Sequence, residues 1–217
     1  MSIEIGLSKV HFPITALGPG RRIAIWFQGC SIRCPGCMSR DTWASARTTM
    51  PVASLVGDLA TWLCEADGVT ISGGEPFDQP EALAALVEGL RCANVGSILV
   101  YSGYSFDILQ EQRAHVLADI DVLISEPFDA ERCEPALLRG SANQRVHCLT
   151  AKGTAMWRLA EEEAAARSAR LDVIADLDGS LWIAGVPQPG DLDRLGNRLG
   201  LVGIRASTSA GRLGGEP

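Results

Sequence analysis

Residues 22–37, RIAIWFQGCSIRCPGC, join a short apolar run to a loop that holds three cysteines. The run Arg22–Phe27 predicts a buried strand. Similar runs recur along the chain, with amphipathic helical patterns between them. Strand and helix therefore alternate, which predicts an α/β fold: a parallel sheet or a partial, open β/α barrel with its helices outside. The further predicted strands are residues 68–72, 97–101, 121–125 and 145–150.

Three helical patterns lie between these strands, and each gathers its apolar residues on one face. The third helix is expected to begin after Ser105, whose side chain suits an N-cap. The apolar positions are Val52, Leu55, Val56, Leu59, Trp62 and Leu63 in the first helix, Leu83, Leu86, Val87 and Leu90 in the second, and Ile108, Leu109, Val116 and Ile120 in the third.

The composition limits the class of protein. A chain of 217 residues that is 47% hydrophobic is long enough for one well-buried domain with a small appendage. A net charge of -7 argues against a broad surface for nucleic acid. No apolar run approaches the length of a membrane span, and no export signal is evident. We therefore predict a soluble, cytoplasmic protein that binds neither nucleic acid nor membrane.

The seven cysteines are an odd set, and clustered thiols in such a chain favour metal binding or redox chemistry over disulfides. Cys30, Cys34 and Cys37 lie on one loop, where three thiolates can hold three irons of a 4Fe-4S cluster. The fourth iron is then open to a small molecule with an amine and a carboxylate. A structural zinc site is the alternative, and its fourth ligand would come from His11, Cys64, Cys92, Cys133 or Cys148.

The second predicted strand ends in a GGEP turn at residues 73–76. Gly73 and Gly74 lack side chains, so a ligand can approach their backbone, and Glu75 offers a carboxylate to a cationic group. This suits the ammonium end of an amino acid. The same four letters recur at residues 214–217 without a preceding strand, where we expect a frayed tail.

Together these residues resemble the radical S-adenosylmethionine superfamily. The spacing of Cys30, Cys34 and Cys37 matches its cluster motif, and residues 73–75 match its GGE element. Over residues 17–146 the likeness sharpens to the activating proteins of anaerobic ribonucleotide reductase. The similar elements are GPGRR at 18–22, TW at 42–43, VYSGYSF at 100–106, DVLISEPF at 121–128 and LRGSANQR at 138–145.

The resemblance implies two cofactors, a 4Fe-4S cluster on the three cysteines and S-adenosyl-L-methionine, whose amino group Gly73, Gly74 and Glu75 would steady. An electron from the reduced cluster would break a carbon–sulfur bond and leave methionine and a 5'-deoxyadenosyl radical. The resemblance also implies partners. The radical would abstract hydrogen from a backbone glycine of a glycyl radical enzyme, and a low-potential donor such as flavodoxin or ferredoxin would supply the electron.

Other polar residues allow two interpretations each. Ser102 and Glu126 end predicted strands, where they either meet the ribose or adenine or only cap turns. A polar loop either contacts a cofactor or partner or organises itself by local hydrogen bonds; its residues are Arg139, Ser141, Asn143 and Gln144.

The remaining cysteines and the histidines give weaker signals. Cys64 and Cys92 fall in helical patterns and are predicted to be small core residues. The leftover cysteines are far apart in sequence, which argues against a second cluster. No spacing typical of a metal site relates the three histidines, His11, His115 and His147.

We predict a core domain over residues 1–150 and a C-terminal extension over residues 151–217. The extension reads as a charged helix, a β-hairpin with its turn at Asp178-Gly179, a short helix and a flexible tail. It could cover the sheet edge, dock a partner or receive a different substrate.

Three functions remain open from the sequence. The first is an activase that installs a glycyl radical on a partner such as anaerobic ribonucleotide reductase. The second keeps the radical chemistry but modifies a peptide or a small molecule. The third is a non-catalytic iron–sulfur electron carrier or structural metal protein.

Overall fold

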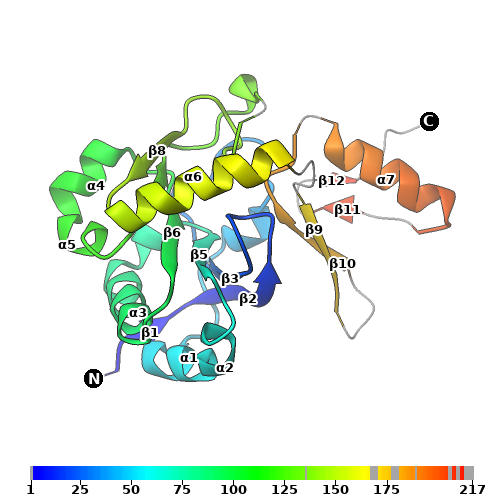
Figure 1. Ribbon diagram of the computed structural model, residues 1–217. Coiled ribbons are helices and arrows are strands. Elements are labelled where there is room, and N and C mark those ends of the chain that lie inside the picture. The colour runs from blue at the N-terminus through cyan, green and yellow to red at the C-terminus, as the bar shows by residue number, and fades with distance from the viewer. Residues whose placement is uncertain are drawn as a thin grey trace.

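The computed structural model describes residues 2–134, 136–166, 171–176, 181–188, 190–204, 207–208 and 211–212. Its largest sheet has six strands in the order β2-β3-β5-β6-β7-β8 (Figure 1). The four inner strands are parallel, and each edge strand is antiparallel to its neighbour. The strands are β2 (Leu7–Ile14), β3 (Arg22–Phe27), β5 (Gly68–Gly73), β6 (Ser97–Tyr101), β7 (Val122–Ser125) and β8 (Arg145–Cys148).

Shorter elements make up the rest of the regular structure among the described residues. Two-stranded pairs join β1 (Glu4–Ile5) to β4 (Met50–Pro51), β9 (Leu171–Ala175) to β10 (Leu181–Gly185), and β11 (Ser207–Thr208) to β12 (Gly211–Arg212). The helices are α1 (Val52–Asp58), α2 (Ala60–Leu63), α3 (Pro80–Cys92), α4 (Phe106–Gln112), α5 (Ala114–Leu117), α6 (Ala151–Ala166) and α7 (Asp191–Leu201). Three 3-10 turns are η1 (Arg40–Thr42), η2 (Pro76–Asp78) and η3 (Ala130–Arg132).

The predicted α/β architecture with a mostly parallel sheet is confirmed. Alternate residues of β3 face opposite sides, as a strand requires: Ile23, Ile25 and Phe27 join the main core, whereas Ala24 packs on the other side. Helices α1, α3, α4 and α5 cover the main-core face. The sheet is open, with β2 and β8 at its two edges, so a partial barrel of the radical SAM type stays a prediction.

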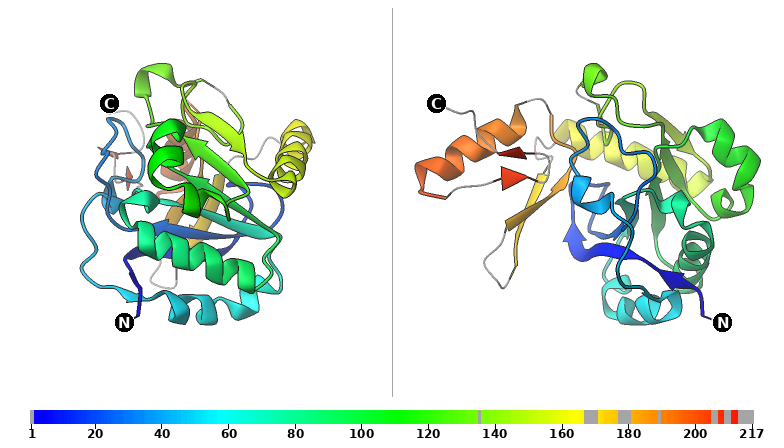
Figure 2. Two further views of the ribbon diagram at one scale, coloured as in Figure 1. Left: turned by 90° about the vertical axis from the view of Figure 1, so that its left-hand side faces the viewer. Right: turned by 180° about the vertical axis from the view of Figure 1, so that it is seen from behind.

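The second face of the sheet is covered in two places (Figures 1 and 2). Helix α6 lies over β6 and β7, where Met156 packs in one cluster with Leu99 and Ile124. The β9–β10 hairpin lies over β2 and β3, where Ala184 packs with Ala24. Because α6 shares a hydrophobic cluster with core strands, the division at residue 150 stays a prediction rather than a visible boundary.

The hairpin is held by polar contacts as well as by apolar packing. The carboxylate of Asp172 accepts hydrogen bonds from Thr15 N at 2.6 Å, Thr15 Oγ1 at 2.9 Å and Ala16 N at 2.9 Å. The ring of Trp182 meets Trp26 edge-on, with 5.5 Å between centroids. These contacts join strand β9 to the loop after β2, and β10 to β3.

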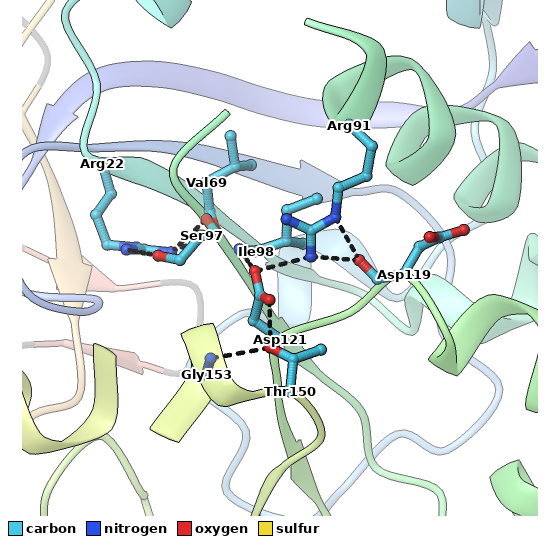
Figure 3. Close-up of polar contacts among 9 residues, drawn as sticks. All are labelled: Arg22, Val69, Arg91, Ser97, Ile98, Asp119, Asp121, Thr150 and Gly153. Carbon is cyan, nitrogen blue, oxygen red and sulfur yellow. Dashed lines mark hydrogen bonds and ion pairs between the residues drawn. The ribbon is translucent and has the colours of Figure 1, made fainter. Parts of the chain in front are cut away.

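A fully buried arginine closes the amino-terminal end of the second face. Arg22 has no exposed surface, and its guanidinium donates to Thr70 Oγ1 at 2.6 Å, to Ser97 Oγ at 3.1 Å and to the carbonyls of Val69 and Ser97 at 2.6 and 3.1 Å. Figure 3 shows part of this arrangement. Burial lowers the pKa of Arg22 to about 10, which still leaves the group charged at neutral pH.

A second buried charge ties the helices of both faces to the sheet. Asp121 is 2% exposed and accepts from Arg91 Nη2 at 2.8 Å, from Ile98 N at 2.8 Å and from Thr150 Oγ1 at 2.6 Å (Figure 3). The Thr150 hydroxyl in turn accepts from Gly153 N, in the first turn of α6. One carboxylate therefore connects α3, β6 and the start of α6.

Several sequence predictions need correction. The helix over residues 52–63 breaks into α1 and α2, and the third breaks into α4 and α5, because hydrophobic periodicity records the buried face but not a change of axis. Ser105 does cap α4, but Ile108 is 43% exposed.

Strand β2 was not predicted. Strand β8 is an antiparallel, half-exposed edge strand rather than a buried one, since an edge strand has a neighbour on one side only.

Cys64 and Cys92 are both exposed, so their prediction as core residues was wrong. Cys64 follows α2 and Cys92 ends α3, where the chain leaves the core.

The predicted Asp178-Gly179 turn and the final five residues lie outside the described residues. Within the described chain, no helix is both long and apolar enough to span a membrane.

Candidate functional site

A cavity of about 730 Å³ opens at the carboxyl ends of the parallel strands. Cysteines from the loop after β3 face it together with residues that end β5 and follow β6 and β7. Its volume falls within the usual range of small-molecule sites. All the predicted site residues line it: Cys30, Cys34, Cys37, Gly73, Gly74, Glu75, Ser102 and Glu126. Their individual roles remain predictions.

Backbone hydrogen bonds shape the cysteine loop. Cys30 N donates to the carbonyl of Trp43 at 3.3 Å, and Cys37 N donates to the carbonyl of Cys34 at 3.1 Å. Arg33 and Gly36 have positive φ angles of 52° and 77°, which turn the chain tightly between the cysteines. The loop therefore presents three half-buried thiols to one cavity.

The chemistry of these thiols fits an iron–sulfur cluster. Burial raises the pKa values of Cys30 and Cys34, so the free thiols favour the protonated form, and metal coordination is what deprotonates such a group. Among the described residues, no three His, Cys, Asp or Glu side chains lie close enough to share a single metal ion. A cluster does not require that, because each thiolate binds a different iron.

The two glycines after β5 have a structural cause that the sequence did not reveal. A Cβ on Gly74 would overlap the carbonyl of Gly29, and one on Gly73, whose φ is 105°, would overlap the backbone of Phe27. Gly74 N donates to the Phe27 carbonyl at 2.8 Å, and Glu75 N donates to the Gly29 carbonyl at 2.8 Å. The missing side chains therefore let this turn pack directly on the start of the cysteine loop.

Glu75 is a buried carboxylate held by neutral donors. Its Oε1 accepts from Phe77 N at 3.0 Å and from Ser102 Oγ at 2.9 Å, and its Oε2 accepts from Gly103 N at 2.7 Å. Burial is the largest influence and raises the pKa of Glu75 to about 7. A cation bound nearby would restore the charged form.

The charges on the cavity wall are acidic. Its described lining includes Glu75, Glu126 and Asp193 but no lysine, arginine or histidine. A cationic ligand is favoured in such a field, and S-adenosylmethionine carries a sulfonium and an ammonium group.

The two predicted strand-end residues, Ser102 and Glu126, differ in whether the side chain or the backbone makes their hydrogen bonds. The Ser102 hydroxyl donates to Glu75 and accepts from Tyr104 N at 3.1 Å, so its proton is used to position the carboxylate. Glu126 has a positive φ of 82°, and its backbone is fixed by the Tyr104 carbonyl and by the Gln144 side chain. Its half-exposed carboxylate stays on the cavity wall.

The polar loop after η3 is organised by its own hydrogen bonds. Gln144 Oε1 accepts from Gly140 N at 2.8 Å, and Asn143 Nδ2 donates to the Pro127 carbonyl at 2.7 Å. Ser141 Oγ accepts from Asp129 N at 3.1 Å, and Arg139 donates to the Gln144 carbonyl. Gly140 and Gln144 also line the cavity.

Sequence reasoning missed several residues of the site. Asp78 accepts from Ser31 N at 2.7 Å, Ser31 Oγ at 2.9 Å and Tyr104 Oη at 2.7 Å, which pins the cysteine loop to η2 and to the loop after β6. The one sequence feature that could have identified Asp78 is its position three residues after Glu75. Cys133 lines the cavity. His147 stacks on Phe106 and does not belong to the described lining.

Comparison with known proteins identifies the family. The model of the 4Fe-4S single cluster domain matches residues 16–147. The anaerobic ribonucleoside-triphosphate reductase-activating protein of Salmonella typhimurium is 33% identical over 149 residues, which cover 64% of this chain and 96% of that protein. The protein of the same name from Escherichia coli K12 is 32% identical with the same coverage. This chain belongs to that activating-protein family.

Family membership confirms the cofactor and enzyme predictions. The protein is a radical S-adenosylmethionine enzyme with a 4Fe-4S cluster and S-adenosylmethionine as cofactors. The family model ends before α6, β9, β10 and α7. Among solved structures, QueE from Escherichia coli superposes with a TM-score of 0.41 at 20% identity over 46% of this chain and 53% of that one, which is too loose a match to define the fold.

Proposed function

We propose that this protein installs a glycyl radical on an anaerobic ribonucleotide reductase. The observation that carries the proposal is the family match together with one acidic cavity that gathers the three loop cysteines and the GGE turn. When bound, the cofactors supply a 5'-deoxyadenosyl radical by reductive cleavage of S-adenosylmethionine. The partner supplies a backbone glycine from which hydrogen is removed.

The chain's own residues have distinct tasks in this proposal. Cys30, Cys34 and Cys37 hold the cluster. Glu75 and the backbone of the two preceding glycines orient the cationic amino group of S-adenosylmethionine, and Ser102 fixes the Glu75 carboxylate by the hydrogen bond of 2.9 Å. Glu126 stands on the wall where the nucleoside would lie.

The finer assignments complete the proposal. A low-potential donor such as flavodoxin or ferredoxin reduces the cluster, and the reducing cytoplasm suits an oxygen-sensitive centre. Residues 1–150 form the radical SAM core as a partial barrel, and residues 151–217 extend it. Support for the last point is the match of the family model to residues 16–147.

The test begins with anaerobic reconstitution by iron and sulfide, reduction, and an assay for 5'-deoxyadenosine. Cys34→Ala should lose cleavage, because it removes a cluster ligand. Cys64→Ala is the matched control, since Cys64 is exposed and does not line the cavity. Adding the anaerobic ribonucleotide reductase of the same organism should then give a glycyl radical signal by electron paramagnetic resonance.

The outcomes separate the alternatives. Cleavage without a radical on the reductase would favour a peptide or small-molecule substrate. A reconstituted cluster that never cleaves S-adenosylmethionine would leave only the electron carrier or structural role.

A further inference from the structure

One side of the cavity comes from the C-terminal extension. Residues 183–188 line it with Gly190, Leu192 and Asp193, and they connect β10 to the start of α7. The family model ends at residue 147, so these residues lie outside the part of the chain that it matches. The extension therefore adds a wall to the cavity that also contains the cluster cysteines.

This wall is fixed to the core. Ala184 is 2% exposed and packs against Ile14, Leu17 and Ala24. The same hairpin is anchored through Asp172 to Thr15. The wall is therefore held by contacts with β2, with β3 and with the loop after β2.

Gln188 is the unusual residue of this wall. Its backbone N donates to Asp191 Oδ2 at 2.7 Å, which fixes the chain just before α7. Its side-chain carbonyl oxygen, Oε1, is buried, and the described residues offer it no hydrogen-bond partner. Across the same lining, the indole Nε1 of Trp43 is also buried without a partner in the described chain. Two residues of the cavity lining therefore carry a buried side-chain atom without a partner in the described chain, an acceptor on Gln188 and a donor on Trp43, and each atom is unfavourable until it is paired.

A peptide backbone matches this pair of groups. A substrate glycine has no side chain to recognise, so an enzyme can bind it only through peptide N–H and C=O groups and through the absence of a Cβ. A peptide N–H would pair with the carbonyl of Gln188, and a peptide C=O would pair with the indole of Trp43.

We propose that Gln188 is a specificity-determining residue that accepts a hydrogen bond from the backbone of the partner's glycine-bearing segment. This inference rests on the proposed function and deepens it, because it assigns the extension a direct contact with the protein substrate. A site that binds a hydrogen-bonding substrate discriminates through such buried polar groups, which are left unpaired by a wrong substrate.

The test compares variants of the full-length, cluster-loaded protein. Gln188→Met keeps the volume and removes the acceptor, whereas Gln188→Glu keeps an acceptor. Gln110→Met is the control, because Gln110 lies on an exposed position of α4 outside the cavity. The measured quantities are the KM for the anaerobic ribonucleotide reductase, the KM for S-adenosylmethionine, and kcat from the rate of glycyl radical formation. Iron content verifies that each variant is loaded.

Gln188→Met should raise the KM for the reductase about tenfold, with kcat and the KM for S-adenosylmethionine changed less than twofold. Gln188→Glu should keep most of the affinity for the reductase that Gln188→Met loses. An unchanged KM for the reductase, or a larger effect on the KM for S-adenosylmethionine, would overturn the inference alone. A parent protein that cleaves S-adenosylmethionine but forms no glycyl radical would overturn the proposed function and this inference with it.

Discussion

The hydroxyl of Ser102 donates to Oε1 of Glu75 over 2.9 Å and so joins the carboxyl ends of β5 and β6. Ser102 is 5% exposed and Glu75 is 2% exposed, so both groups of this hydrogen bond are withdrawn from water. The carboxylate has three neutral donors, and burial raises its pKa to about 7. The ionised Glu75 carboxylate therefore destabilises the folded protein by itself, and a cationic ligand would stabilise it.

This penalty should appear in the pH dependence of stability. The folded pKa of Glu75 lies above its ordinary value of 4.5, so the folded protein keeps a proton that the unfolded chain loses. The contribution of Glu75 should therefore lower the free energy of unfolding by about 3 kcal/mol as the pH rises from about 4.5 to about 7. Urea unfolding of the cluster-free protein at several pH values measures it.

Glu75→Gln is the variant that isolates the effect. Its stability should depend less on pH across this window, because the amide does not titrate. Subtracting the two profiles removes the contributions of His11 and His147, whose pKa values are lowered by burial and act in the opposite direction. Parallel profiles would show that Glu75 titrates normally.

The contact between the GGE turn and the cysteine loop gives a second prediction. Gly74→Ala should destabilise the protein by about 1–3 kcal/mol and reduce cluster loading, because the new Cβ overlaps the Gly29 carbonyl. Gly57→Ala in α1 should be neutral or stabilise by about 0.5–1 kcal/mol, since nothing lies near its Cβ position. Thermal unfolding and iron content measure both effects; equal behaviour of the two variants would contradict the packing explanation.

The sequence was sufficient to predict that the eight candidate site residues share one cavity. The short, strongly apolar strands could be recognised in the sequence, and this located the loops that follow them. The carboxyl ends of parallel strands meet at one edge of a sheet. Residues as far apart as Cys30 and Glu126 were therefore brought together correctly. The same logic gave the buried face of α3, whose Leu83, Leu86 and Leu90 are fully buried.

The remaining features depend on contacts between distant residues. Arg22 reads as a strand's first, solvated residue, and only Thr70 and Ser97, 48 and 75 positions away, make it a buried one. Gln188 has no local signal, because its surroundings exist only after the hairpin docks on β2 and β3. Periodicity could not predict either environment, since it reports a residue's own face and not the partner that meets it.

Arg22 supports a third prediction. Arg22→Met should lower the free energy of unfolding by about 2–4 kcal/mol, because the carbonyls of Val69 and Ser97 would lose a charged donor in a buried place. Arg21→Met is the matched control, because Arg21 is half-exposed and its guanidinium makes a surface ion pair with Glu65 at 3.3 Å and lies 4.8 Å from the centroid of the Phe12 ring. Its loss should cost about 0–1 kcal/mol. Urea unfolding of both variants decides; similar values would mean that the buried network contributes little.

The docking of the hairpin supports the last prediction, and Asp172 is the residue that tests it. Asp172→Ala removes the acceptor of three hydrogen bonds from Thr15 and Ala16, which should weaken the attachment of β9 and β10 by about 1–2 kcal/mol. Hydrogen exchange at the backbone amides of these strands should then quicken about 5- to 30-fold, while amides of β5 and β6 keep their protection.

Asp176→Ala provides the comparison, because Asp176 makes one partly exposed ion pair with Lys9 at 3.2 Å. Its effect on exchange should be less than about threefold, as expected for a surface pair. If Asp172→Ala quickens exchange and also raises the KM for the reductase, the extension acts on the site through its docked position. If exchange quickens and the KM does not change, the cavity wall at residues 183–188 holds without this anchor, and Ala184 with its apolar neighbours carries the attachment.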